Sequence, residues 1–80
     1  MKHKRFQQDV IEEIRKAGES HPPIQNIHEG YAVLLEEVDE FWDEVKKKTK
    51  ERDPKKLYKE LVQVAAMAQR IVEDVVAKQL

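Results

Sequence analysis

Apolar side chains recur every three or four positions along most of the chain, which is the spacing typical of amphipathic α-helices. Only two glycines and three prolines interrupt this pattern in 80 residues, so helix should dominate the structure. A chain of this length forms one domain at most. We therefore predict an all-α fold in a single domain, residues 1–80, with helices over about residues 4–17, 26–50 and 54–78.

Capping residues indicate where the three helices begin and end. Gly18 is the expected C-terminal cap of the first helix, because glycine adopts the left-handed conformation at little cost. The prolines at 22–23 cannot continue a helix and predict a loop. Asn26 is the expected N-cap of the second helix. Asp53 and Pro54 are expected to open the third helix as N-cap and first helical residue.

The third predicted helix carries more apolar surface than a single short chain can cover. From Leu61 to Ala68 only Gln63 is polar. The apolar positions of this helix are Leu57, Tyr58, Leu61, Val64, Ala65, Met67, Ala68, Ile71, Val72, Val75 and Val76. A helix that is apolar over most of its girth must be covered on more than one side.

A partner chain is the expected cover. Short domains often rely on disulfides, metals or oligomerisation, and this sequence contains no cysteine. We therefore expect the chain to complete a helical bundle by self-association, as a homodimer or a homotetramer. A compact three-helix monomer is the alternative. The broad apolar girth counts against a third possibility, a small coiled-coil adaptor with a narrow two-stranded seam.

Composition argues against nucleic-acid and membrane partners and indicates the cellular compartment to expect. The 15 Lys and Arg residues nearly cancel the 16 Asp and Glu residues, giving a net charge of −1, so nothing favours binding to nucleic acid. No apolar run reaches the roughly 18 residues that a membrane-spanning helix needs. The absence of cysteine fits a reducing compartment, and a cytoplasmic protein is expected.

The second predicted helix carries one continuous apolar stripe. Its members are Ile27, Tyr31, Leu34, Leu35, Val38, Phe41, Trp42 and Val45. The steps of three and four between them favour core packing for the whole stripe. The three aromatic side chains in it also have the flat faces that could stack on a nucleobase.

Acidic side chains gather on one sector of the second helix. At 100° per residue, Glu37, Glu40 and Glu44 lie close together around the helix. Glu60 and Gln63 lie one turn apart on the third helix, beside its most apolar stretch. If the two helices are neighbours, their oxygens could line a cleft for a hard cation such as Mg²⁺. The alternative is that these are ordinary solvated surface charges.

Two segments resemble a known family at these residues. Leu34-Leu35-Glu36-Glu37-Val38-Asp39-Glu40-Phe41-Trp42 is followed by Lys59-Glu60-Leu61-Val62-Gln63-Val64-Ala65-Ala66-Met67-Ala68. Together they resemble the MazG-like nucleoside triphosphate pyrophosphohydrolases, of the all-α NTP pyrophosphatase superfamily that includes the dimeric dUTPases. The family pattern is Glu-x-x-Glu on one helix and Glu-x-x-Asp on the next. The resemblance covers about residues 26–76.

The resemblance implies a reaction and assigns roles to residues. It implies Mg²⁺-dependent cleavage of a nucleoside triphosphate into a nucleoside monophosphate and pyrophosphate, with Mn²⁺ as a possible substitute. The implied metal ligands are Glu37, Glu40, Glu60 and Gln63. Glu36 or Glu40 would orient the attacking water, as the catalytic carboxylate. The implied substrate-binding residues are Lys59, Arg70 and Trp42.

Gln63 departs from the family pattern, which has an aspartate at this position. An amide oxygen can bind a cation, but it brings no negative charge. The substitution therefore leaves a second reading open, in which the chain is a catalytically inactive MazG-like helical dimer that binds a nucleotide or a protein. The three histidines show no metal-ligand spacing, and no Gly-rich phosphate loop is present.

Overall fold

The computed structural model describes the backbone of residues 2–80 and the side chains of residues 5–80. These residues form the helices α1 (Lys2–Ser20), α2 (Ile27–Val45) and α3 (Pro54–Asp74). Two short 3-10 turns, η1 (Thr49–Glu51) and η2 (Val76–Gln79), precede and follow α3. Residues 2–80 contain no strand, so the predicted all-α class is confirmed. Within the same residues, no helix is long and apolar enough to span a bilayer.

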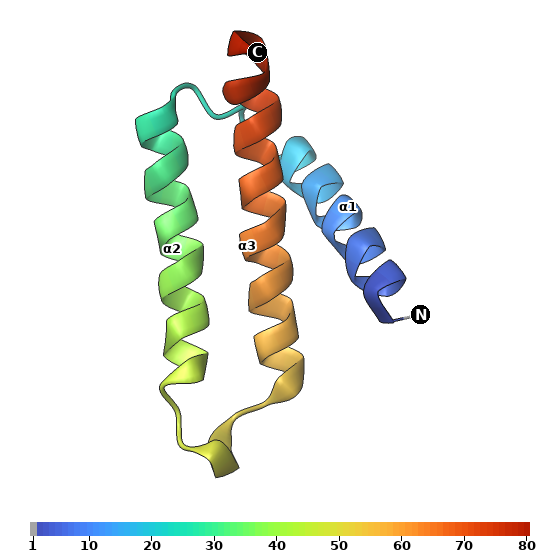
Figure 1. Cartoon of the computed structure of the whole chain (residues 1–80), viewed down its shortest axis with the longest axis vertical. Coiled ribbons are helices and arrows are strands. Elements are labelled where there is room, and N and C mark those ends of the chain that lie inside the picture. Colours follow the sequence, from blue (N-terminus) through green and yellow to red (C-terminus); the bar gives the residue numbers. More distant parts are fainter. Residues whose placement is uncertain (1) are drawn as a thin grey trace.

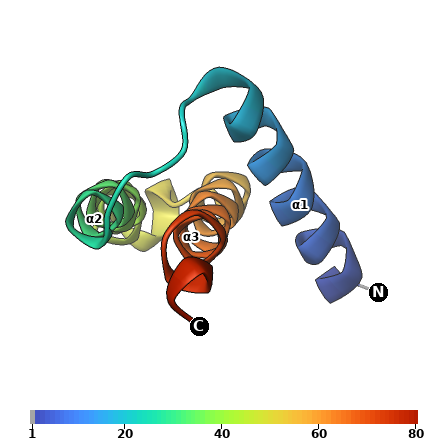
Figure 2. The ribbon, with the colours of Figure 1, turned by 90° about the horizontal axis from the view of Figure 1, so that it is seen from above.

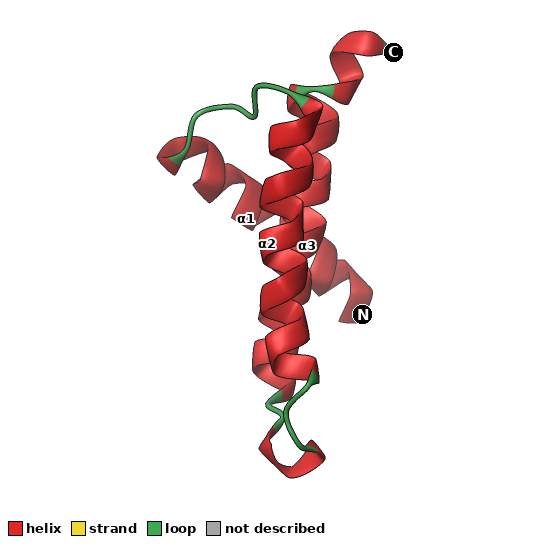
Figure 3. Cartoon of the chain, turned by 90° about the vertical axis from the view of Figure 1, so that its left-hand side faces the viewer, coloured by secondary structure: helices red, strands yellow, loops and turns green. Residues whose placement is uncertain are grey.

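Helix α3 lies at the centre of the fold. Helices α2 and α3 run antiparallel beside each other, and α1 packs obliquely on another side of α3 (Figures 1 and 2). Seen from the side, α2 and α3 stand upright while α1 crosses behind them (Figure 3). Since α1 and α2 both pack mainly on α3 rather than on each other, the chain forms an open arrangement with grooves between its helices.

The observed N-caps match the expected ones, because each cap residue has a side-chain oxygen that can reach the first free N–H groups. The Asn26 side chain accepts a hydrogen bond from Glu29 N at 2.9 Å. The Asp53 side chain accepts from Lys55 N at 2.9 Å, and Pro54 is the first helical residue.

The observed helix ends differ from the predicted ones. Helix α1 continues through Gly18 to Ser20, because His21 N still donates to Ala17 O at 2.9 Å before Pro22 removes the next donor. Helix α2 ends at Val45 rather than near residue 50. Arg52 Nε donates to Val45 O at 2.8 Å and so satisfies a carbonyl at that end. Helix α3 ends at Asp74, and the chain tightens into a 3-10 turn before residue 78.

Two small apolar clusters hold the helices together. Val10 of α1 packs with Val62 and Ala66 of α3, and Phe6, Ile14 and Ala65 adjoin them. On another side of α3, Ile24, Ile71 and Val75 form a second cluster, which Val33, Leu34, Met67 and Val76 extend. Among the described side chains none of the large ones is fully buried, which is the expected consequence of so short a chain.

Helix α2 approaches α3 closely at Gly30. A Cβ atom at Gly30 would lie 3.1 Å from Ile71 Cγ1 and 3.2 Å from Ile71 Cγ2. Only a residue without a side chain fits this contact without movement of Ile71, so Gly30 sets how closely the two helices pack.

The loop over residues 21–26 is fastened to the C-terminal half of α3. Ile24 is buried there, and its backbone N–H donates to Asp74 Oδ2 at 2.9 Å. Arg70 Nη2 donates to Pro22 O at 3.2 Å. These contacts fix the direction in which the chain passes from α1 to α2.

Core packing was expected for the whole apolar stripe of α2. The structure of one chain shows that this prediction is wrong for part of the stripe. Tyr31 is 67% exposed and Trp42 is 56% exposed. Ile27, Leu35 and Val38 are exposed on the same side of α2, while Leu34, Phe41 and Val45 are half-buried. The stripe is wider than the strip of α2 that α3 can cover, so its outer edge faces away from the chain.

Candidate metal centre

Three carboxylates from two helices converge on the α2–α3 pair. Glu37 and Glu40 lie one turn apart on α2, and Glu60 lies on α3. One carboxylate oxygen from each lies within 4.8 Å of the other two. We call these three residues the carboxylate cluster. Because each comes from a regular helix, the backbone positions of all three are fixed by helix packing rather than by a loop.

The register of the antiparallel pair explains the convergence. Gly30 faces Ile71. Glu37 lies seven residues after Gly30 on α2. Val64, which is next to Gln63, lies seven residues before Ile71 on α3. Glu40, one turn beyond, is then level with Glu60. The contact at Gly30 therefore decides which acidic side chains meet.

Two oxygens of the carboxylate cluster are buried without a partner. Glu37 Oε2 and Glu60 Oε2 are both inaccessible, and neither has a hydrogen-bond partner among the described residues while all three carboxyls are ionised. Protonation of Glu37 or Glu60 would allow a hydrogen bond with Glu40. Buried carboxylate oxygens are normally paired, because leaving them unpaired forfeits their hydration without compensation. Hard divalent cations take oxygen ligands of this kind, so the donor set fits Mg²⁺ or Mn²⁺.

The electrostatics of the carboxylate cluster favour a positive charge. Burial raises the pKa of Glu37 to about 7, and the negative charge of Glu40, a hydrogen bond with the Glu40 side chain and the charges of Glu60 and Glu36 add to the rise. Burial also raises the pKa of Glu60, the charge of Glu40 and a hydrogen bond with its side chain add to this rise, and Lys59 opposes it. A bound divalent cation would relieve both the repulsion and the lost hydration.

The other proposed ligand and the nearby polar residues surround this cluster. Gln63 shares a groove with Glu37. Glu36 is exposed and lines an adjoining groove, also with Glu37. Lys59 is exposed, and its ammonium group is close enough to Glu60 to act on that carboxyl electrostatically. Gln63, Glu36 and Lys59 therefore all lie near the carboxylate cluster.

Trp42 lies away from the carboxylate cluster, whereas Arg70 lines a groove beside it. On α2, Trp42 is on nearly the opposite side of the helix from Glu37 and Glu40, so within one chain it does not adjoin the carboxylate cluster. Arg70 is buried, with 8% of its surface exposed, and its hydrogen bond to Pro22 O holds the loop after α1. It nevertheless lines the same groove as Glu37 and Gln63.

Sequence patterns gave no signal for the contribution of α1. Lys16, Ser20 and His21, at the end of α1 and just after it, line the groove beside Glu37 and Gln63. The packing of α1 on α3 places Lys16 and Ser20, and the loop that Arg70 and Asp74 hold follows His21. No local spacing in the sequence encodes those contacts.

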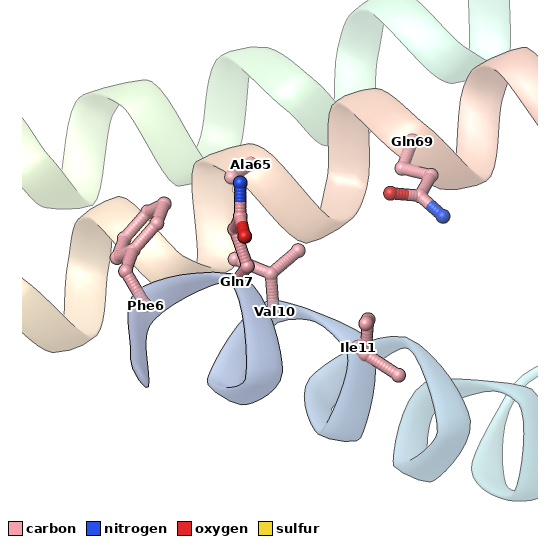
Figure 4. Close-up of a pocket in the computed structure, with 6 residues that line it drawn as sticks. All are labelled: Phe6, Gln7, Val10, Ile11, Ala65 and Gln69. Atoms are coloured by element: carbon pink, nitrogen blue, oxygen red, sulfur yellow. The ribbon is translucent and has the colours of Figure 1, made fainter. Parts of the chain in front are cut away.

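A groove between α1 and α3 has a different character. It holds about 400 Å³ and is lined by Phe6, Gln7, Val10, Ile11, Ala65 and Gln69 (Figure 4). None of these side chains is titratable. It therefore offers shape and apolar surface, but no group for acid–base or metal chemistry.

Comparisons with protein-family models, with curated proteins and with solved structures give no match.

The raised pKa of Glu37 gives a testable dependence of stability on pH. Its pKa of about 7 in the folded chain exceeds the ordinary 4.5, so the folded state binds this proton more tightly. The stabilisation is complete below about pH 4.5 and is lost as the pH rises through 7. Without metal, Glu37→Gln should therefore be more stable than wild type at pH 8, by about 1 kcal/mol after solvent screening.

Urea denaturation in EDTA, between pH 4 and pH 8, measures this difference. Glu36→Gln is the matched control, since it removes the same charge from the exposed neighbour, and its effect should be smaller. Equal pH profiles for wild type and Glu37→Gln would show that Glu37 titrates as an ordinary surface carboxylate.

Proposed function

We propose that the chain is an Mg²⁺-dependent nucleoside triphosphate pyrophosphohydrolase, with Mn²⁺ able to replace Mg²⁺. The single observation that carries this proposal is the convergence of Glu37, Glu40 and Glu60, with two carboxylate oxygens buried and unpartnered. An acidic surface patch has no reason to bury such oxygens. The resemblance to the MazG-like family supports the same reaction from the order and spacing of these residues.

The proposed reaction is hydrolysis between the α and β phosphates. Water adds to the α phosphorus, the bond to the bridging oxygen breaks, and pyrophosphate leaves with that oxygen. When bound by Glu37, Glu40 and Glu60, Mg²⁺ would offset negative charge on the phosphates and lower the pKa of a water molecule. The protein itself has to place the phosphates, orient the water and accept its proton.

Residues around the carboxylate cluster suit these tasks. Glu36 is exposed next to Glu37, where its carboxylate can orient a water molecule and take its proton. Glu40 is the alternative for this role, since it is the exposed member of the cluster. Lys59 offers an ammonium group to a phosphate oxygen. Gln63 offers an amide oxygen to the cation or an amide N–H to a phosphate.

Gln63 favours one competing function. An uncharged ligand weakens the hold on a divalent cation, so the chain could bind a nucleotide or a protein without hydrolysing a triphosphate. Gln63→Asp separates the two. If the variant binds Mg²⁺ more tightly and releases more pyrophosphate than wild type, the cation site exists and Gln63 tunes it. If Mg²⁺ affinity is unmeasurable in both proteins, the competing function stands.

A pyrophosphate-release assay on a panel of canonical and modified triphosphates tests the proposed reaction. We expect turnover that requires Mg²⁺ or Mn²⁺. Glu60→Gln should lower it by about 100-fold or more, because it removes a charged ligand, while far-UV circular dichroism stays unchanged. Glu73→Gln, an exposed glutamate on the same helix, is the matched control and should retain wild-type turnover. Absence of turnover for every triphosphate with either ion would contradict the proposal.

We further propose that the chain self-associates through an exposed apolar face. This face consists of Ile27, Tyr31, Leu35, Val38, Trp42, Leu61 and Val72, all of them exposed. On α2 and on α3, these residues lie well round the helix from the carboxylates. Because the carboxylates of both helices meet on one side of the pair, the apolar residues share the other side.

The exposure of the apolar face supports a second copy as its cover. All seven side chains are between 40% and 67% exposed, and exposed apolar side chains that gather on one face mark an interaction site. A two-fold axis would place α2 and α3 against the same helices of the partner. The carboxylate cluster of each chain would stay accessible.

The mass in solution tests this assembly. We expect light scattering to give twice or four times the 9.5 kDa of one chain. Trp42→Glu should shift the mass to that of one chain, because it introduces a charge into the face that the assembly would bury. Leu80→Glu, a similar change at a side chain that is 95% exposed, should leave the assembly intact. A wild-type mass of 9.5 kDa at micromolar concentration would exclude the assembly.

A further inference from the structure

Charge is unevenly distributed along the α2–α3 pair. Helix α2 carries seven carboxylates and no lysine or arginine. Residues 46–56, which follow it, carry seven lysines and arginines and two carboxylates, a net charge of +5. Since the whole chain carries −1, all the other residues together carry −6. We call residues 46–56 the basic end, which lies at the bottom of the pair in Figure 1.

Most cations of the basic end have no carboxylate partner. Lys46 pairs with Asp43 at 3.0 Å, and Lys47 pairs with Glu44 at 2.9 Å. The other five cations are exposed and form no ion pair with a described side chain; they are Lys48, Lys50, Arg52, Lys55 and Lys56. An anion can therefore reach all five without displacing a carboxylate.

The acidic part of the chain does not cancel this positive charge for a large anion. The chain extends 44 Å along its longest axis, whereas in 0.1 M salt exposed charges are screened beyond about 10 Å. A polyanion at the basic end therefore responds to the local charge rather than to the net charge of the chain. The expectation that nucleic acid does not bind came from the net charge, which averages the two regions.

A groove beside the basic end adds an aromatic side chain to these cations. The groove holds about 510 Å³ and is lined by Arg5, Pro54, Lys55 and Tyr58. Arg5 belongs to α1 and Lys55 to α3, so both helices bring positive charge to it. The side chain of Arg5 is 83% exposed, although its Nε lies 4.0 Å from Asp9 Oδ2.

The ring of Tyr58 is held in place from α1. The hydroxyl of Tyr58 donates to the carboxylate of Asp9, and the ring of Phe6 packs edge to face with it, with 5.7 Å between the centroids. Tyr58 is nevertheless 37% exposed. A fixed and partly exposed aromatic ring between cations can stack on a nucleobase.

These features favour a single-stranded nucleic acid over a membrane surface. A bilayer binds a protein surface best when apolar side chains insert beside the cations. Among residues 43–60, Tyr58 is the one large apolar side chain that is exposed, and it lines a groove that a flat surface cannot enter. A single strand can lay its phosphates along the cations and turn a base into the groove.

We propose that the basic end and the adjoining groove bind single-stranded DNA or RNA. The phosphates contact Lys48, Lys50, Arg52 and Lys55, and a base stacks on Tyr58. This binding does not depend on the proposed hydrolysis, because Tyr58 lies on nearly the opposite side of α3 from Glu60.

Fluorescence anisotropy with a labelled oligothymidine of about 20 nucleotides, longer than a typical single-strand site, tests the proposal. EDTA in the buffer separates it from metal binding and hydrolysis. We expect binding whose logarithm falls with the logarithm of salt concentration with a slope of about −3, because each of four phosphate contacts contributes about −0.7.

Two pairs of variants locate the site. Combined Lys50→Glu and Lys55→Glu should weaken binding by about tenfold or more, since both reverse a phosphate contact. Combined Lys16→Glu and Lys78→Glu is the matched control, because it changes the net charge equally at exposed positions outside the basic end, and it should bind as wild type does. Tyr58→Leu should weaken binding by about tenfold, whereas Tyr58→Phe, which keeps the ring, should not.

No oligothymidine binding at about 50 mM salt, where phosphate contacts are strong, would overturn the proposal, as would equal weakening by the two charge-reversed proteins. Sedimentation with phosphatidylserine vesicles identifies the competing partner. Vesicle binding that the Lys50→Glu and Lys55→Glu protein loses, without oligothymidine binding, would assign the basic end to a membrane surface and overturn the proposal. Equal affinity of Tyr58→Leu and wild type would overturn the placement of a base in the groove.

Discussion

The packing of α2 on α3 is the constraint on which the rest of the structure depends. Gly30 faces Ile71, where a Cβ atom would lie 3.1 Å from Ile71 Cγ1, so the missing side chain lets the two helices pack closely in their antiparallel register. The register then brings Glu37 and Glu40 of α2 to Glu60 of α3, with one oxygen from each within 4.8 Å. The same close packing removes water from Glu37 Oε2 and Glu60 Oε2. Helix packing thus creates an electrostatic cost that a divalent cation can relieve.

The α2–α3 pair carries carboxylates on one side and exposed apolar side chains on the opposite side. One side carries the carboxylate cluster and the two grooves that Glu37 also lines. The other carries exposed apolar side chains, including Tyr31 and Trp42. Assembly through the apolar side would stabilise a chain whose own two cores are small. Because the polar side is not used in that contact, each chain in the assembly would keep its own carboxylate cluster accessible.

Local patterns predicted the helices and their N-caps, because periodicity and capping depend on residues a few positions apart. Helix periodicity allowed Glu37, Glu40 and Glu60 to meet if the second and third helices are neighbours, with solvated surface charges as the alternative, and the structure brings the three together. Local patterns did not predict the features that depend on contacts between residues far apart in the sequence. Gly18 does not end α1, since the end depends on Pro22. The donors from α1 were missed, because the packing of α1 on α3 and the loop after α1 depend on such contacts.

The central claim is that one divalent cation is shared by carboxylates of α2 and α3, and paramagnetic broadening by Mn²⁺ tests it most directly. In amide NMR spectra with substoichiometric Mn²⁺, we expect the signals of residues 36–41 and 59–64 to broaden first and together. Glu60→Gln should abolish the effect on both segments. Broadening spread over other acidic residues, such as Glu12 and Glu19 on α1, or unchanged by Glu60→Gln, would contradict the claim.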